Sequence, residues 1–272
     1  MSLQSNDRRY RLGFIGGGKL AGSVLRGLVR AEFCPASEIL VSEPNKDARE
    51  SLGVELGVRV TTENAEIAAE AEIILIGVKP GVVLEVVASI AEVERQVISL
   101  AAGVGVASME ANGKARFMRA MTNTPAAVGQ AATAIARGPR SDEQDIARAR
   151  AIFEAIGTVV EVPETMIDAV TALGGSGPAF VYSVIEALAA GGTKCGLSPA
   201  VSLGLATQTV RGAAQLALES GLSPEELRRM VITPGGTTAA GLAVMDERRT
   251  AESICAAVIA AAARAKELAP PA

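Results

Sequence analysis

The most informative absence from this 272-residue sequence is histidine, which does not occur at all. Histidine is the side chain that most often acts as a general base, and it is also the commonest metal ligand. Its absence excludes every Ser-His-Asp arrangement, and we expect no metal site. The chemistry of this protein must therefore use hydroxyls, carboxylates, lysine, backbone amides or a bound cofactor.

Cysteine is also scarce, and its pattern excludes a disulfide framework. Cys34, Cys195 and Cys255 are scattered and odd in number, which indicates reduced thiols in the cytoplasm. The net charge of −4 gives no basic surface for nucleic acid. No stretch is apolar for long enough to cross a bilayer, so we expect neither a nucleic-acid nor a membrane partner. Residues 1–10 do not resemble a secretory signal, and we expect them to form a disordered leader.

Aromatic residues make up only 3% of the chain, while alanine is abundant in its second half. Such helices approach one another closely but bury little side-chain area by themselves. A helical half of about a hundred residues with this composition often completes its core with a second chain. We therefore expect a homodimer formed through the second half.

The first half of the chain alternates strand-like and helix-like segments. Apolar runs such as RLGFIG, EILVSE, IILIGV and QVISL are separated by segments with helical spacing. Strands that are apolar throughout and separated by helices predict a mainly parallel α/β sheet covered on both faces. From Glu164 onward we find only helical stretches broken by glycine and proline. The sequence thus predicts an α/β domain over residues 1–163 and an all-helical domain over residues 164–272.

A glycine motif lies between the first predicted strand and the first predicted helix, in FIGGGKLAGSVLRGL. Gly16 permits the tight turn, Gly18 lets a pyrophosphate reach the backbone, and the small Ala21 allows close packing of helix and strand. The following helix N-terminus offers amides and a partial positive charge to phosphates. This context predicts a Rossmann-type, doubly wound domain that binds a nicotinamide dinucleotide. The predicted cofactor residues of this loop are Gly16, Gly17, Gly18, Lys19 and Leu20.

The end of the second strand leaves the type of dinucleotide open. Glu43 stands where an acid binds the ribose diol of NADH and repels a 2′-phosphate. Ser42, Asn45 and the basic Lys46 and Arg49 could instead receive the phosphate of NADPH, although both basic residues also fit a solvated helix face.

Loops after other strands should border the cofactor, because ligands of such sheets lie beyond the carboxyl ends of the strands. Asn123 has two interpretations: its amide orients a nicotinamide or a substrate, or it forms an Asx-type turn before Pro125. The predicted cofactor residues in these loops are Val78, Lys79, Pro80, Ala101, Ala102, Gly103 and Asn123.

Two glycine-rich helix entries mark the second half. The segment GGSGP, which ends at Pro178, either lets another backbone come near or kinks two crossing helices. The segment ITPGGTT precedes an amphipathic helix. Free amides of Gly236, Thr237 and Thr238, with threonine hydroxyls beside them, predict an anion site of carboxylate size. The alternative is ordinary N-capping by one of the two threonines.

These segments occur in the order found in one known family. The segments FIGGGKLAGSVLRGL, VKPG, SLAAGV, MTNTPAAVG, DAVTALGGSGPAFVYSVIEAL and ITPGGTTAAGL resemble pyrroline-5-carboxylate reductases, and the resemblance runs from about Leu12 to Leu268. It implies a Rossmann domain and a helical domain that interlocks with a partner's to form a homodimer, often assembled further into a decamer. It also implies the last step of proline biosynthesis, reduction of Δ1-pyrroline-5-carboxylate to L-proline, with NADH or the NADPH that the family favours.

The resemblance also implies a set of substrate contacts. The ITPGGTT entry would hold the substrate carboxylate, and Thr238 is our candidate catalytic residue, hydrogen-bonded to the ring nitrogen. The implied substrate-binding residues are Gly175, Ser176, Gly177, Thr233, Gly235, Gly236, Thr237 and Thr238. The chain departs from the family at four positions, with Thr122 in place of the usual proline, Gly174 and Thr233 in place of serine, and Phe180 in place of tyrosine.

Two other classes of protein share part of this pattern. A β-hydroxyacid dehydrogenase has the same two-part plan but needs a lysine on the helix after its glycine cluster. Here AFVYSVIEAL follows the cluster without a lysine, and Lys194 comes later in the loop-like GGTKCG. A dinucleotide-sensing or assembly protein without turnover would keep the first glycine motif, but it has no reason to keep the glycine–threonine entry.

Overall fold

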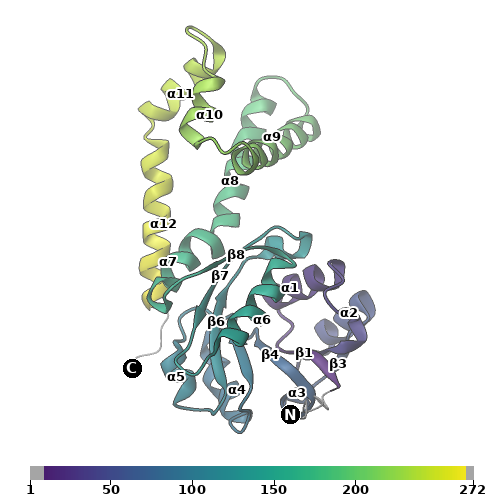
Figure 1. Ribbon diagram of the computed structural model, residues 1–272. Coiled ribbons are helices and arrows are strands. Elements are labelled where there is room, and N and C mark those ends of the chain that lie inside the picture. Colours follow the sequence, from purple (N-terminus) through teal and green to yellow (C-terminus); the bar gives the residue numbers. More distant parts are fainter. Residues whose placement is uncertain (1–8, 268–272) are drawn as a thin grey trace. The chain divides into compact units, whose positions relative to one another are not determined.

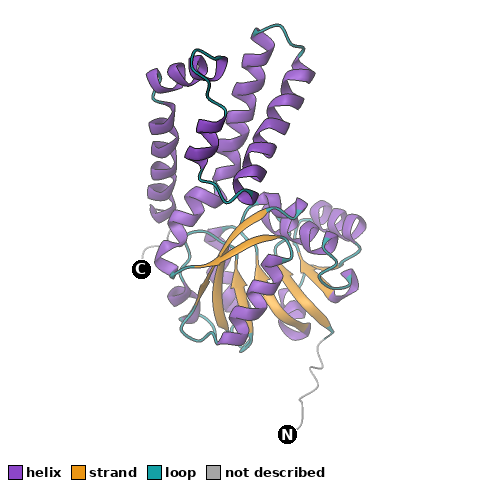
Figure 2. Ribbon diagram, turned by 45° about the horizontal axis from the view of Figure 1, so that its top comes forward, coloured by secondary structure: helices purple, strands orange, loops and turns teal. Residues whose placement is uncertain are grey.

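The computed structural model describes residues 9–267, and its first compact unit contains an eight-stranded sheet with helices on both faces (Figures 1 and 2). The strand order is β3-β2-β1-β4-β5-β6-β7-β8, and every neighbouring pair is parallel except β6 and β7. The predicted, mainly parallel sheet is thereby confirmed. The strands are β1 (Tyr10–Ile15), β2 (Ile39–Ser42), β3 (Arg59–Thr61), β4 (Ala71–Ile76), β5 (Gln96–Ser99), β6 (Arg116–Met121), β7 (Ala131–Arg137) and β8 (Gly157–Glu161).

Local signals in the sequence explain where the helices of this unit begin and end. Asn45 caps α2 by accepting the Ala48 amide, and Gly57 ends the helix with a φ of +69°. Asp142 and Asp145 form a capping box at the start of α6. The helices are α1 (Lys19–Arg30), α2 (Lys46–Leu56), α3 (Asn64–Glu70), α4 (Val83–Ser89), α5 (Val106–Glu110), α6 (Glu143–Glu154) and α7 (Ile167–Val170). Shorter turns are η1 (Ala36–Glu38), η2 (Pro80–Val82), η3 (Thr124–Val128), η4 (Glu164–Met166) and the π-helical η5 (Thr171–Gly175).

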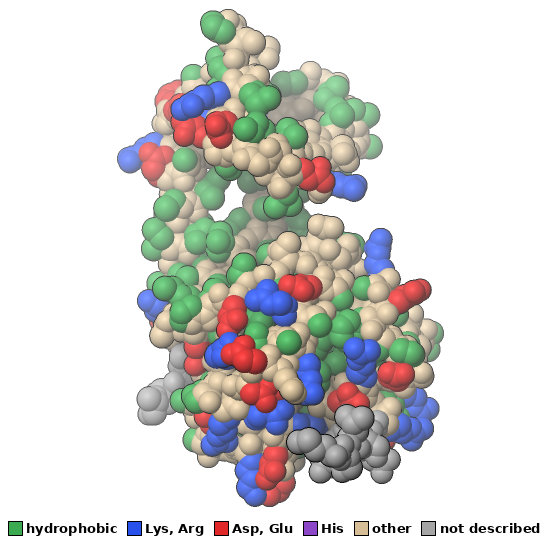
Figure 3. All heavy atoms as spheres, viewed as in Figure 1, with side chains coloured by type: hydrophobic (Ala, Val, Ile, Leu, Met, Phe, Trp, Pro, Cys, Tyr) green, Lys and Arg blue, Asp and Glu red, His purple; other side chains and the backbone are tan. Residues whose placement is uncertain are grey.

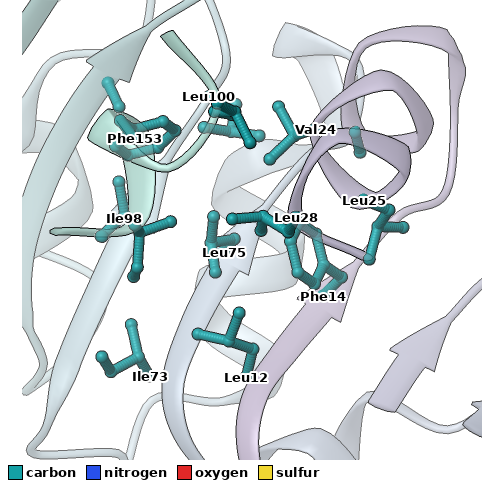
Figure 4. Packing of buried hydrophobic residues seen from close by; sticks show 14 of the residues in the cluster. Leu12, Phe14, Val24, Leu25, Leu28, Ile73, Leu75, Ile98, Leu100 and Phe153 are labelled. Carbon is teal, nitrogen blue, oxygen red and sulfur yellow. The ribbon is translucent and has the colours of Figure 1, made fainter. Parts of the chain in front are cut away.

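The sheet carries a hydrophobic core on each face. Phe14 and Leu75 point from one face toward Leu28 of α1, and Phe153 of α6 completes this layer (Figure 4). All four side chains are fully buried. The second core covers the opposite face through Ile67 of α3, Val83 and Val87 of α4, and Met109 of α5. Burial on both faces explains why the strands read as continuous apolar runs rather than alternating ones.

Two predicted boundaries differ from the structure. Residues 1–8 of the expected leader lie outside the described residues, but Tyr10 begins β1 and is 1% exposed because its side chain belongs to the second core. The first compact unit runs on to Ser176, past the predicted boundary after residue 163, and includes the chain from Ala260. The reason is that α7 and η5 pack on β7 and β6, where Ile167 is buried.

The second compact unit, Gly177–Ile259, is helical, and the described chain has no strand after β8. Its helices are α8 (Gly177–Lys194), α9 (Pro199–Glu219), α10 (Pro224–Met230), α11 (Thr237–Glu247) and α12 (Thr250–Glu267), of which α12 continues into the first unit. Helices α8 and α9 approach closely at Gly192, where a Cβ would lie 3.0 Å from the Ser202 hydroxyl oxygen. Lys194 ends α8, so the loop predicted at that residue was wrong: Gly191 and Gly192 continue the helix, and Gly192 faces α9.

The helical unit leaves much apolar surface exposed within one chain (Figure 3). Helices α8, α10 and α11 contain no buried residue. Their exposed side chains, with those of α9 and α12, include Tyr182, Leu188, Leu203, Leu205, Leu216, Leu218, Met230, Val244 and Ile259. Apolar surface of this extent marks an interface with another protein. Within residues 9–267, no helix has the length and apolarity needed to cross a membrane.

Candidate functional site

The site in the first unit is built around the loop that joins β1 to α1. Gly16 has a φ of +94°, and a Cβ there would lie 2.9 Å from the Gly77 carbonyl oxygen. A Cβ on Gly77 would in turn lie 2.5 Å from the Ala21 Cβ. The tight turn and the close approach of α1 to the loop after β4 therefore both require small residues, as the glycine motif predicts.

The N-terminus of α1 is open toward this loop. Its N-cap residue, Gly18, makes no side-chain cap, and no acidic residue lies in the first turn. A Cβ at Gly18 would meet nothing within 4 Å. The first amides of a helix lack acceptors within it, so those of Lys19 and Leu20 remain available to an anion. These donors and this open space fit a pyrophosphate.

Glu43, at the end of β2, ties two loops together. One carboxylate oxygen accepts the Gly17 amide at 2.8 Å, and the other accepts the Asn45 amide at 2.9 Å. The Arg49 guanidinium donates to the carbonyl oxygen of Glu43, while Lys46 forms an exposed ion pair with Glu50. Glu43 therefore supports the glycine loop directly, a role that its position in the sequence did not reveal.

A first cavity lies beyond the ends of β1 and β2. Ser42 donates a hydrogen bond of 2.7 Å to the Asn64 side-chain oxygen at its edge. We did not predict Asn64, but it opens α3 shortly after β3, so the rule that located the other loops would have found it. The cavity is lined by Ile15, Gly16, Ser42, Pro44, Asn64, Val78, Val82, Glu85, Val86 and Ser89.

A second cavity shares Val78 with the first and lies over the ends of β4, β5 and β6. Seven of its lining residues were predicted to bind the cofactor, and Gly175 was predicted to bind the substrate. Leu100, Met121, Thr122 and Thr124 were not predicted. The predicted cofactor residues that line neither cavity are Gly17, Gly18, Glu43, Lys79 and Gly103. The full lining is Lys19, Leu20, Val78, Pro80, Leu100, Ala101, Ala102, Met121, Thr122, Asn123, Thr124 and Gly175.

Both polar groups of the Asn123 side chain bond to the chain itself. Its amide nitrogen donates to the Gly174 carbonyl oxygen at 3.0 Å, and its amide oxygen accepts the Ala132 amide at 3.2 Å. It makes no side-chain cap to η3, so no Asx-type turn forms. Asn123 is 7% exposed, and its amide bonds the chain rather than pointing freely into the cavity.

The neighbouring departures from the family pattern are accommodated without strain. The hydroxyls of Thr122 and Thr133 are 2.8 Å apart and pair with each other in a buried position. A Cβ on Gly174 would have its nearest contact at 3.8 Å, an ordinary van der Waals distance. Neither departure closes the cavity.

A partly buried ion pair supports the loop after β5. Arg119 of β6 is 5% exposed, and its guanidinium lies 3.3 Å from a Glu164 carboxylate oxygen. The same oxygen accepts the Val106 amide at 2.7 Å. Glu164 thus ties η4 to the end of the loop that carries Ala101 and Ala102.

The helix entry before α11 belongs to the second unit. Gly235 has a φ of +70°, which favours glycine, and a Cβ at Gly236 would lie 2.3 Å from the Thr233 hydroxyl oxygen and displace it. The Gly236 amide donates to the Thr233 carbonyl at 3.0 Å, so the prediction that it is free was wrong. Gly236 is the N-cap without a side-chain bond, which leaves the amides and hydroxyls of Thr237 and Thr238 at an uncapped helix start.

The remaining predicted residues continue the helical chain. The Ser176 amide donates to the Thr171 carbonyl oxygen at 2.9 Å, and Gly177 begins α8. The lysine that a β-hydroxyacid dehydrogenase needs is missing from the body of α8, where Lys194 is the last residue. Among the described residues, no cluster of acidic or cysteine side chains could hold a metal ion.

Comparisons with known proteins agree with this geometry. Residues 164–268 match the family model "Pyrroline-5-carboxylate reductase dimerisation", and residues 11–103 match "NADP oxidoreductase coenzyme F420-dependent". Pyrroline-5-carboxylate reductases of Synechocystis and Methanosarcina acetivorans are 43% and 40% identical to the chain. Each alignment covers 95% of this chain, with 98% and 97% of the respective relative.

Solved structures show the same likeness. A pyrroline-5-carboxylate reductase from Coxiella burnetii is 33% identical, with a TM-score of 0.87 over 97% of this chain and 100% of that one. The Plasmodium falciparum pyrroline carboxylate reductase, solved with NADP bound, is 26% identical, also with a TM-score of 0.87, over 97% of this chain and 99% of that one. The glycine loop, the two cavities and this full-length similarity together identify the chain as a member of the pyrroline-5-carboxylate reductase family.

Proposed function

We propose that this protein reduces Δ1-pyrroline-5-carboxylate to L-proline with a reduced nicotinamide dinucleotide, as the last step of proline biosynthesis. The observation that carries the proposal is the open N-terminus of α1 between two cavities that share Val78. This is the frame for a dinucleotide in a doubly wound sheet, whose ligands lie beyond the carboxyl ends of the strands. Relatives that match the chain over its whole length carry the name of this activity.

The fit of a dinucleotide assigns a role to each part of the first unit. The amides of Gly18, Lys19 and Leu20 would hold the pyrophosphate, and the cavity beside Ser42 and Asn64 would hold the adenosine. The cavity beside Ala101, Ala102 and Gly175 would hold the nicotinamide. When bound, the reduced nicotinamide supplies the hydride for the reaction.

Histidine is not needed for this reaction. The substrate is a cyclic imine whose carbon accepts hydride most readily when the ring nitrogen is protonated, and that proton can come from water. We propose that the first-turn amides and hydroxyls of Thr237 and Thr238 bind the substrate carboxylate, with Gly235 and Gly236 shaping the turn. Thr238 would also donate a hydrogen bond to the ring nitrogen. Most of the rate would then come from holding the imine carbon in place for hydride transfer.

The side chains at the end of β2 favour NADH over NADPH, although the family favours NADPH. Glu43 places a negative charge at the end of β2 and holds the Gly17 amide. The Arg49 guanidinium is held on the backbone carbonyls of Glu43 and Pro44, and Lys46 is paired with Glu50. We propose that the enzyme accepts both dinucleotides and that Glu43 lowers its preference for NADPH.

The dimerisation domain indicates a homodimer. We propose further assembly into a decamer in the cytoplasm. Size-exclusion chromatography with light scattering would separate dimer from decamer by mass, and a monomer would contradict both.

The function is tested by following nicotinamide absorbance with Δ1-pyrroline-5-carboxylate, with NADPH and NADH in parallel. We expect oxidation of the dinucleotide with proline formed in equal amount. A folded protein that binds either dinucleotide but oxidises neither would contradict the proposal.

A further inference from the structure

The π-helical turn η5 contains a backbone carbonyl, that of Gly174, which cannot accept the ordinary α-helical hydrogen bond. The Ser176 amide bonds to the Thr171 carbonyl five residues earlier, as a π-helix requires. In an α-helix, the Gly174 carbonyl would accept from residue 178, but that residue is Pro178, which has no N–H. A carbonyl that is partly withdrawn from water is stabilised by a donor, and at this turn a side chain from another part of the fold provides one.

The Asn123 side chain supplies that donor. Its amide nitrogen bonds to Gly174, while its amide oxygen accepts the amide of Ala132 at the start of β7. One side chain therefore holds η5 to the sheet through a donor and an acceptor at once. Among residues of this length, only asparagine offers both groups without a charge.

The turn held in this way forms part of the cavity assigned to the nicotinamide. Gly175 lines that cavity together with Asn123 and Met121, and a Cβ on Gly175 would lie 3.6 Å from the Met121 sulfur. The position of this wall follows the Asn123 bond, because Pro178 removes the helical bond that would otherwise fix the Gly174 carbonyl.

We propose that Asn123 is a positioning residue for hydride transfer, which it supports by holding the η5 wall rather than by touching the reacting atoms. This inference rests on the proposed function. A wall displaced by about 1 Å misaligns imine and nicotinamide, and misplacement of that size can cost roughly 100-fold in rate. Dinucleotide affinity would change little, since the amides of Lys19 and Leu20 would hold the pyrophosphate and the Asn123 amide is engaged within the chain, with Gly174 and Ala132.

The test is Asn123→Asp, which keeps the acceptor for Ala132 and loses the donor for Gly174. Asn112→Asp is the matched control, because the Asn112 amide nitrogen likewise donates to a helix carbonyl, that of Ser108, at an exposed site that lines neither cavity. We expect Asn123→Asp to lower kcat/KM for Δ1-pyrroline-5-carboxylate by roughly 10- to 100-fold and to leave the dinucleotide Kd unchanged. Asn112→Asp should change neither.

Hydrogen exchange provides a readout that does not depend on activity. Amides of residues 171–176 should exchange faster in Asn123→Asp than in the wild type or in Asn112→Asp. Wild-type kcat/KM in Asn123→Asp, or an equal loss of dinucleotide affinity, would overturn the positioning role. A merely structural role would lower Tm and leave kcat and KM unchanged. If the wild type did not reduce this imine, the proposed function would fail. Unchanged hydrogen exchange in Asn123→Asp would show instead that the Asn123–Gly174 hydrogen bond does not hold η5, whatever the activity.

Discussion

The contact between α1 and η3 gives a prediction about Gly27 that can be worked out from distances. A Cβ at Gly27 would lie 2.2 Å from the Ala126 carbonyl oxygen and 2.8 Å from an Ile156 methyl carbon. The first neighbour is backbone and has no other rotamer, so α1 and η3 must separate in Gly27→Ala. The first residue of each element, Lys19 of α1 and Thr124 of η3, lines the second cavity.

The expected cost follows from two opposing effects. Overpacking against rigid backbone costs about 3 kcal/mol, at the upper end of its usual range. Replacing glycine by alanine within a helix returns about 1 kcal/mol, which leaves a net loss of about 2 kcal/mol. In a chain of this size that loss lowers Tm by roughly 4–8 °C. Dinucleotide Kd should rise as well, because the α1 N-terminus moves relative to the loops of the second cavity.

Gly53→Ala in α2 is the matched control. A Cβ there would have its nearest contact, with Val60, at 3.5 Å, which is ordinary packing. The same substitution should therefore raise stability by about 0.5–1 kcal/mol through helix propensity. Both variants and the wild type would be melted by circular dichroism at equal protein concentration, since dimerisation contributes to Tm. A Tm for Gly27→Ala at or above that of the wild type would refute the packing argument.

Three further predictions test the site and its support. Thr238→Ala should sharply lower kcat while the dinucleotide Kd stays unchanged, and equal turnover would remove the catalytic assignment. Glu43→Gln loses the charge and one of two acceptors, so titration by fluorescence should show weaker NADH binding and a higher ratio of NADPH to NADH affinity; an unchanged ratio would exclude Glu43 from selectivity. The Asp142 pKa is lowered, chiefly by the Asp145 amide that its carboxylate accepts. Its contribution to stability is therefore present above the ordinary aspartate pKa and is lost as pH falls through the lowered one. Asp142→Ala should lower Tm at pH 7, and the difference from the wild type should shrink in acid; a pH-independent difference would contradict this linkage.

The order of elements was predictable because local patterns and tertiary packing agree in the first unit. The apolar runs became the buried strands of a mainly parallel sheet, and the spacing KDARESLGVEL became α2 over the same residues. Helix α5 was not predicted, because five residues are too few to show a helical period. The end of the expected leader was misplaced because no signal in the sequence shows that Tyr10 already belongs to the first strand, where it is buried.

The residues of the candidate site were predictable where backbone conformation is the requirement. Gly16 and Gly235 have positive φ values, and a Cβ on Gly236 would displace the Thr233 hydroxyl. A turn's backbone conformation depends on a few consecutive residues, so the sequence shows these positions as glycine. The hydrogen-bond partners of side chains were not predictable. Glu43 bonds to Gly17 and Asn123 bonds to Gly174, and each of these hydrogen bonds joins segments that are distant along the chain.

By itself, the sequence determined the two-part plan, the glycine loop after the first strand, the glycine–threonine helix entry and the exclusion of histidine chemistry. Only the tertiary structure decided what the amide of Asn123 and the carboxylate of Glu43 bond to, and that Asn64 borders the first cavity. The physical reason is the distance along the chain over which each feature is determined. A turn or a helix start is fixed by a few consecutive residues, whereas a side-chain hydrogen bond depends on which strands lie side by side, and that is set only when the sheet has formed.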